Sequence, residues 1–185
     1  MMRLILGGSA SGKSEYAEGL AGDLAGDRPL FYLATMQEDG EETLARIDRH
    51  VRRREGMGFH TLEIPYDLDC SSFAEALGPV SPSYLPRETG GVILLECVSN
   101  LLANQIFDRR SGGYDQDRFC EGILGLGKLC QDLVIVSNNV HEDGIQYDPM
   151  TQNYIRQLGQ INRRLARSCG QVTEIVAGLP LQLKE

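Results

Sequence analysis

An eight-residue stretch near the amino terminus has the residue types and spacing to bind phosphate. Gly7, Gly12, Lys13 and Ser14 match the pattern G-x-x-x-x-G-K-[ST] of a phosphate-binding loop. In this pattern backbone N–H groups point at phosphate oxygens, the lysine neutralises the β- and γ-phosphates, and the serine hydroxyl binds Mg²⁺. The alternative, a glycine-rich turn with an exposed lysine, is disfavoured because an apolar run precedes the stretch and a helical pattern follows it. We therefore expect a nucleoside triphosphate to bind at Gly7, Gly8, Ser9, Ala10, Ser11, Gly12, Lys13 and Ser14.

Glu96 is the second candidate for the same site. It ends the apolar run Val92–Leu95, and an acid at the end of a buried strand places a carboxylate at the sheet edge, near the nucleotide's Mg²⁺. Aspartate is the more usual residue at this position, and an acid after a strand is common without any such role. Beside the phosphate-binding loop, however, it predicts a Mg²⁺ site formed by Ser14 and Glu96.

A second cluster surrounds His50. Arg46, His50 and Arg54 are spaced i, i+4, i+8 in a segment, 41–54, that we predict to be helical, so they share one face. A neutral imidazole can attack a phosphorus atom, and arginines can hold phosphates through two hydrogen bonds each. Acid–arginine pairs at i, i+4 spacing in the same segment fit an ordinary solvated helix equally well. The spacing alone leaves both interpretations of His50 open.

The remaining histidines and the cysteines show no metal-ligand spacing. His60 is predicted to pack within a strand, and His141 follows a strand at the sheet edge where such folds bind ligands. Five cysteines at irregular spacing predict reduced, mostly buried thiols: Cys70, Cys97, Cys120, Cys130 and Cys169.

Short apolar runs that alternate with helical patterns must position these residues. Such alternation indicates an α/β fold, P-loop NTPase-like, with a mostly parallel sheet and helices on both faces. We expect strands at 4–6, 30–35, 92–95, 133–136 and 172–176, the last closed by a turn at 178–180. We expect helices at 14–21, 41–54 and 154–166 and another containing Asn100 and Asn104, with surface loops at 78–91 and 108–117.

Length and composition limit the class of protein. The chain has 185 residues, which fits a single domain over 1–185, and its 42% hydrophobic and 24% charged residues are ordinary for a soluble globular protein. No apolar run approaches the roughly 20 residues of a membrane span, and the first apolar run is too short for a secretory signal, so we expect a cytoplasmic protein. A net charge of −8 argues against nucleic acid as a partner, and an anionic substrate must meet local positive charge.

The chain also resembles a known family, the bifunctional adenosylcobinamide kinase / adenosylcobinamide-phosphate guanylyltransferases of cobalamin biosynthesis. The resemblance is collinear over nearly the whole chain, through LILGGSASGKS, FYLAT, ARIDRHVRRR, HTLEIP, VILLECVSNLLAN, VIVSN, LGQINRRLA and VAGLPL. The phosphate-binding loop is shared with many nucleotide-binding proteins. The R-I-x-x-H-x-x-x-R element from Arg46 to Arg54 is far more particular, and it favours the nucleophile interpretation of His50.

The resemblance implies a homotrimeric enzyme with two activities. ATP or GTP phosphorylates the aminopropanol hydroxyl of adenosylcobinamide; GTP then guanylylates His50, and the corrinoid phosphate takes the GMP to give adenosylcobinamide-GDP. His50 and Lys13 are the implied catalytic residues, with Mg²⁺ as the metal. Further nucleotide contacts are implied at Ala34, Thr35, Arg54, Glu63 and Glu96.

Three positions depart from the family's usual residues. Ser9-Ala10 stands where the family usually has Ala-Arg, Asn139 where it typically has Glu, and Gln152 lies in a weakened Arg-x-Phe-x-Asp stretch. The alternatives that follow are an enzyme with only the guanylyltransferase step and a nucleotide-binding homologue with reduced catalysis. A third is an unrelated small-molecule P-loop kinase with His50 on a solvated helix face.

Overall fold

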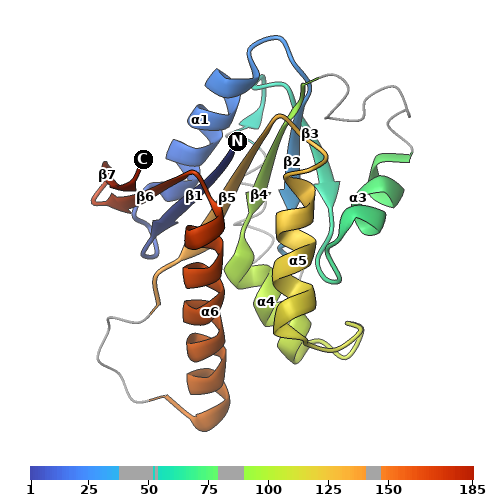
Figure 1. The fold of residues 1–185 in the computed structure, drawn as a ribbon, viewed down its shortest axis with the longest axis vertical. Coiled ribbons are helices and arrows are strands. Elements are labelled where there is room, and N and C mark those ends of the chain that lie inside the picture. The colour runs from blue at the N-terminus through green and yellow to red at the C-terminus, as the bar shows by residue number, and fades with distance from the viewer. Residues whose placement is uncertain (38–51, 53, 79–89, 141–146) are drawn as a thin grey trace.

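The strands of the chain form one seven-stranded sheet in the order β3-β2-β4-β5-β1-β6-β7 (Figure 1). The computed structural model describes residues 1–37, 52, 54–78, 90–140 and 147–185. Six strands pair in parallel, and the seventh pairs antiparallel to β6. The strands are β1 (Met2–Gly7), β2 (Leu30–Ala34), β3 (Phe59–Glu63), β4 (Val92–Glu96), β5 (Asp132–Asn138), β6 (Gln171–Val176) and β7 (Leu179–Lys184).

Helices pack on both faces of this sheet, as the sequence predicts (Figure 1). Helix α1 packs on one face, where its small buried side chains, Ala17, Ala21 and Ala25, contact the strands closely. The opposite face carries the other helices. The helices are α1 (Lys13–Ala25), α3 (Cys70–Leu77), α4 (Val98–Phe107), α5 (Gln116–Leu126) and α6 (Pro149–Ser168).

The continuous apolar runs of the central strands follow from this two-sided burial. In β4, Val92 and Leu94 point into the core beneath α1, whereas Ile93 and Leu95 point into the larger core beneath α3–α6. Glu96 continues the first alternation, so its side chain lies on the α1 side of the sheet. The alternation of side chains along each strand thus decides which face of the sheet its last side chain lies on.

The predicted end of the chain is wrong in one respect. The segment 178–180 does not close the fold, because β7 follows as a further strand beside β6. Ala177 and Gly178 have φ values of 51° and 81°, which makes a two-residue hairpin turn of the type with both central residues at positive φ. Pro180 fits in β7 because an edge strand need not donate all its hydrogen bonds.

Two helices escape the sequence prediction. Helix α3 begins with a capping box, in which Asp69 accepts from the backbone N–H of Ser72 while the Ser72 hydroxyl accepts from that of Asp69. Helix α5 begins at Gln116, so the predicted loop over 108–117 ends too late. The predicted helix over 41–54 and loop over 78–91 fall mostly outside the described residues, where only residues 52 and 54 of the former are seen as helical.

Two further expectations concern thiols and membranes. All five cysteines are free, and four of them are buried, Cys70 being the exposed one, which confirms the predicted reduced thiols. Over the described ranges, no helix has the length and apolar character needed to span a membrane.

Candidate functional site

The phosphate-binding stretch connects a strand to a helix, as predicted. β1 ends at Gly7, and α1 begins at Lys13 after Gly12, whose φ of 90° is a conformation that favours glycine. The backbone N–H of Ser11 donates to the carbonyl oxygen of Gly8 at 3.3 Å, which curls the loop. The N–H of Gly178 donates to the carbonyl oxygen of Ser11 at 2.9 Å, so the β6–β7 turn braces the loop from outside.

Lys13 folds back over this loop. Its Nζ donates to the carbonyl oxygen of Gly8 at 3.0 Å, and the residue is only 9% exposed. Burial of an ammonium group costs solvation free energy, and a neighbouring anion offsets that cost. The buried Lys13 therefore favours an anion beside it. The loop N–H groups and the amino terminus of α1 add positive potential at the same place. The arrangement is suited to a phosphate.

Three residues that we predict to contact the nucleotide lie side by side at the carboxyl ends of neighbouring strands. Ala34 at the end of β2 is in register with Glu63 of β3 and with Glu96 of β4. Glu63 is exposed and Glu96 is half-buried. The Oε2 atom of Glu96 accepts a hydrogen bond from the Tyr32 hydroxyl at 3.3 Å. The sheet therefore brings two carboxylates to one edge, on the side of α1.

Thr35 supports this edge from within. It is fully buried, and its hydroxyl accepts from the backbone N–H of Cys97 at 2.8 Å while donating toward the carbonyl oxygens of Glu96 and Cys97. Asn104 of α4 donates to the carbonyl oxygen of Thr35 at 2.8 Å. These bonds hold the ends of β2 and β4 together and so fix the backbone that carries Glu96. The predicted nucleotide contact of Thr35 stays a prediction.

Arg54 packs tightly against the same face. It is 8% exposed, its Cζ lies 3.4 Å from the centroid of the Tyr32 ring, and its Nη1 donates to the Thr61 hydroxyl at 3.2 Å. His50 and the arginines at 46, 49 and 53 lie outside the described residues, as does His141. The approach of His50 to the loop therefore stays a prediction. His60 lies in β3, as predicted; its side chain is exposed, with its ring 5.7 Å from that of Phe31.

Sequence reasoning missed two residues at this edge. Tyr32 lies two positions before Ala34 in β2. Side chains two positions apart in a strand share a face, so the predicted site at Ala34 could have pointed to Tyr32. Asn138, in register with Gly7, donates from Nδ2 to the Ser99 hydroxyl at 2.6 Å. Its Oδ1 is buried without a partner among the described residues, so it offers an acceptor beneath the loop.

The donor set fits Mg²⁺ better than a softer metal. Ser14 in the first turn of α1 and Glu96 supply hard oxygen atoms, and Mg²⁺ is usually held by one or two carboxylates together with substrate phosphates and water. Within the described part of the chain no group of three or more His, Cys, Asp or Glu side chains is arranged so that it could hold a metal ion. A metal bound here would thus depend on the nucleotide for most of its ligands.

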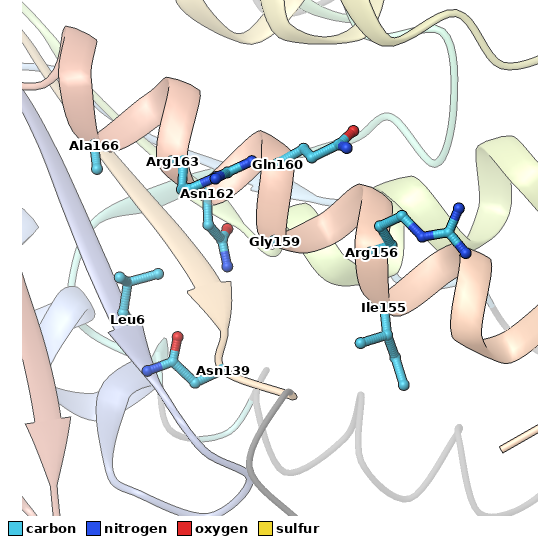
Figure 2. Close-up of a pocket in the computed structure, with 9 residues that line it drawn as sticks. All are labelled: Leu6, Asn139, Ile155, Arg156, Gly159, Gln160, Asn162, Arg163 and Ala166. Carbon is cyan, nitrogen blue, oxygen red and sulfur yellow. The ribbon is translucent and has the colours of Figure 1, made fainter. Parts of the chain in front are cut away.

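A pocket of about 460 Å³ opens beside the loop on the other face of the sheet (Figure 2). Leu6 of β1 and Asn139, which follows β5, line it on the strand side, and α6 lines it on the other side. Arg156 and Arg163 of α6 also line it and are exposed. Asn139 donates from Nδ2 to Oε1 of Glu174 at 2.5 Å. The pocket is thus partly apolar, with polar groups at the strand ends and cations on the helix.

Comparison with known proteins agrees with this geometry. The family described as cobinamide kinase / cobinamide phosphate guanyltransferase matches residues 3–183. The bifunctional adenosylcobalamin biosynthesis protein CobP of Pseudomonas aeruginosa is 32% identical over 185 residues, covering 100% of this chain and 98% of the relative. The corresponding protein CobU of Escherichia coli is 29% identical over 199 residues, covering 100% of both chains.

Solved structures support the fold alone. The ATPase domain of G40P superposes with a TM-score of 0.55 at 8% identity, over 94% of this chain and 68% of that one. The flagellar accessory protein FlaH of Methanocaldococcus jannaschii gives 0.52 at 14% identity, over 99% and 77%. Together, the phosphate-binding loop, the parallel sheet and the match over residues 3–183 identify the chain as a member of the cobinamide kinase / cobinamide phosphate guanyltransferase family, and as an enzyme of that kind.

Proposed function

We propose that this enzyme phosphorylates adenosylcobinamide and then transfers GMP from GTP to the product through a guanylyl-histidine. The observation that carries the proposal is the loop at the start of α1, which holds the buried Lys13 at the carboxyl end of β1, as Glu96 lies at the carboxyl end of β4 in the same parallel sheet. The two bifunctional relatives support the pair of reactions. Both reactions consume nucleoside triphosphates, which fits a cytoplasmic enzyme.

The kinase step is an in-line displacement at the γ-phosphorus. The aminopropanol hydroxyl oxygen of the corrinoid forms the new P–O bond, the bond to the β-phosphate oxygen breaks, and the hydroxyl proton passes to water as the nucleoside diphosphate leaves. The loop N–H groups and Lys13 are placed to hold the negative charge that grows on the phosphoryl oxygens. Mg²⁺ held by Ser14, Glu96 and the phosphates would spread that charge further.

The guanylyl step is two displacements at the α-phosphorus of GTP. An imidazole nitrogen of His50 forms the P–N bond as the bond to pyrophosphate breaks; a phosphate oxygen of the corrinoid then forms the new P–O bond as the P–N bond breaks. Arg54 anchors the chain four residues after His50, and trans peptides advance by at most 3.8 Å each, so their Cα atoms lie within about 15 Å of each other.

The test is covalent labelling with GTP carrying the label on its α-phosphate. The wild-type protein should form an acid-labile, base-stable adduct, as expected for a P–N bond. His50→Ala should remove the adduct, whereas His60→Ala, at an exposed histidine of β3, should retain it. A protein that takes no label at any Mg²⁺ concentration, or that keeps it in His50→Ala, contradicts the proposed intermediate.

A second assay separates the alternatives. Incubation of cobinamide with ATP or GTP should yield cobinamide phosphate, and Lys13→Ala should abolish both this step and the labelling if one loop serves both. Labelling without phosphorylation would favour an enzyme with only the guanylyltransferase step. Nucleotide binding without either reaction would favour a homologue with reduced catalysis. Phosphorylation of another small molecule without labelling would favour the unrelated kinase.

The pocket of Figure 2 is our candidate for the acceptor's arm. A volume of about 460 Å³ is typical of small-ligand sites, large enough for the aminopropanol arm but not for a whole corrin ring. Its arginines, Arg156 and Arg163, would meet the arm once it is phosphorylated. Replacing both with alanine should raise KM for cobinamide phosphate and leave the Kd for GTP unchanged. A change in the GTP Kd alone would argue against this placement.

We also propose that the protein works as a homotrimer. The edge strand β7 exposes Leu179, Leu181 and Leu183, which are 72%, 53% and 54% exposed at alternating positions. An apolar stripe on a sheet edge promotes association unless another surface covers it. Light scattering of the wild type should give three times the mass of the chain, and Leu181→Lys should lower it. A monomeric wild type would refute the assembly.

A further inference from the structure

We infer that Tyr32 is a positioning residue that orients both the Glu96 carboxylate and the Arg54 guanidinium. The inference rests on the proposed function for the roles of His50 and of Glu96 as a Mg²⁺ ligand, whereas the two contacts of Tyr32 are observed. Tyr32 lies in the middle of β2 on the α1 side of the sheet and is only 4% exposed.

Two contacts leave Tyr32 in different directions. Its hydroxyl donates to Oε2 of Glu96 at 3.3 Å, and its ring lies under the Arg54 guanidinium, 3.4 Å from Cζ to centroid. The same guanidinium donates to Thr61, which is in register with Tyr32 on β3. A ring of Phe59 packs edge-on against Tyr32 at 5.8 Å and limits its tilt. One side chain thus orients both a carboxylate and an arginine.

Tyr32 makes both contacts with one side chain. A guanidinium stacks on its aromatic face and its hydroxyl donates to the carboxylate, whereas phenylalanine lacks the donor and leucine lacks both the donor and the ring. Burial above all, and next the negative charge of Glu96, raise the pKa of the Tyr32 hydroxyl far above its usual range, so it stays protonated. The buried carboxylate of Glu18 on α1 acts in the same direction, while Arg54 opposes it. The geometry itself supplies both contacts, with the hydroxyl 3.3 Å from Oε2 of Glu96 and the ring centroid 3.4 Å from Cζ of Arg54.

The two contacts make separable predictions. Loss of the hydroxyl frees the Glu96 carboxylate but leaves the ring beneath Arg54. Loss of the ring also removes the aromatic face on which the Arg54 guanidinium stacks, four residues after His50 in the sequence. Tyr32→Phe should therefore affect the metal requirement alone, and Tyr32→Leu should affect guanylylation as well.

The first experiment measures how binding of a fluorescent GTP analogue depends on Mg²⁺. Tyr32→Phe should need about tenfold more Mg²⁺ for half-maximal enhancement, as expected for one long hydrogen bond to a charged group, while binding in EDTA stays unchanged. Tyr114→Phe is the matched control, because it loses a hydroxyl bond of 3.0 Å to Gln157 away from this edge. An unchanged Mg²⁺ requirement in Tyr32→Phe, or an equal shift in the control, overturns the inference.

The second experiment measures the rate of His50 labelling at saturating Mg²⁺. Tyr32→Phe should label within about twofold of wild type, and Tyr32→Leu at least about tenfold more slowly. Should Tyr32→Leu fail to fold, Arg54→Lys tests the same contact, because it keeps the charge but loses the planar stack and fork. Equal rates for all three variants overturn the link to His50. An unlabelled wild type refutes the proposed function instead, and the Mg²⁺ experiment still decides the role toward Glu96.

Discussion

Gly7→Ala tests whether the phosphate-binding loop depends on the close approach of backbone at its first residue. A Cβ added at Gly7 would lie 2.5 Å from the Ser11 hydroxyl oxygen and 2.9 Å from the carbonyl oxygen of Ile175. The hydroxyl can turn away, but Ile175 belongs to β6, which is paired with β1 in register at Gly7. The added methyl group must therefore push the two strands apart or displace the loop.

The size of the effect follows from this overlap. Overpacking of a rigid interior costs about 1–3 kcal/mol, which for a chain of this length lowers Tm by roughly 3–10 °C. A loop displaced by a fraction of an ångström should also weaken GTP binding by about tenfold or more. Gly19→Ala in α1 is the control, since nothing lies within 4 Å of its added Cβ. That variant should gain about 0.5–1 kcal/mol in helix stability and bind GTP normally.

Thermal unfolding and the Kd for GTP measure the two consequences. The double variant Gly7→Ala/Ser11→Ala removes the hydroxyl overlap but not the overlap with Ile175, so its Tm should recover only in part. If the double variant recovered the full wild-type Tm, the strain would come from the Ser11 side chain and not from Ile175. A Gly7→Ala protein with the Tm and Kd of wild type would refute the reasoning altogether.

Three further predictions concern charge and packing. Asp132 is held by Arg3 at 2.6 Å and by the terminal ammonium at 3.2 Å; burial would raise its pKa, but these partners outweigh burial and keep it below its usual range. Asp132→Asn should thus lose about 2 kcal/mol of unfolding free energy near pH 7; the difference from wild type should begin to shrink as pH falls below about 4 and vanish only below the lowered pKa of the folded state, measured by denaturation across pH. Gly122→Ala should lose about 3 kcal/mol in urea unfolding, because its Cβ would lie 2.0 Å from the Leu68 carbonyl oxygen, and an unfolding free energy equal to wild type would contradict that approach. Glu96→Gln should raise the Mg²⁺ requirement for GTP binding more than Tyr32→Phe does, since it removes the charge itself; a smaller shift would exclude Glu96 as a metal ligand.

The elements that are best predicted from sequence are those marked by a pattern within their own residues. Continuous apolar runs mark β1, β2, β4 and β5, because strands buried on both faces need them, whereas Thr173 and Glu174 interrupt the run of β6. Helix α5 lacks such a signal, since Gly122 and Gly125 weaken its helical pattern and the contact that requires Gly122 is with distant Leu68. The Gly-Leu-Pro run that opens β7 indicates a turn, and only pairing with β6 makes it a strand.

The same division holds at the candidate site. The loop from Gly7 to Ser14 and the position of Glu96 follow from short patterns, because one strand and one turn fix them. Arg54 stacks on Tyr32, although the two residues lie in different segments of the chain. Nothing in either segment's sequence predicts this contact. Long-range side-chain pairs of this kind need the strand register, which no local pattern supplies.

The register also changes the meaning of Asn139. On sequence alone, asparagine in place of the family's usual glutamate removes a carboxylate from an edge suited to ligands. In the fold, however, Glu174 lies beside it on β6 and accepts its Nδ2 hydrogen bond at 2.5 Å. A carboxylate therefore remains at this edge, delivered by the neighbouring strand and oriented by the amide. The case for a lost kinase step then rests on Ser9-Ala10 in the loop and on Gln152, whose side chain donates to the carbonyl oxygen of Tyr147 at the start of α6.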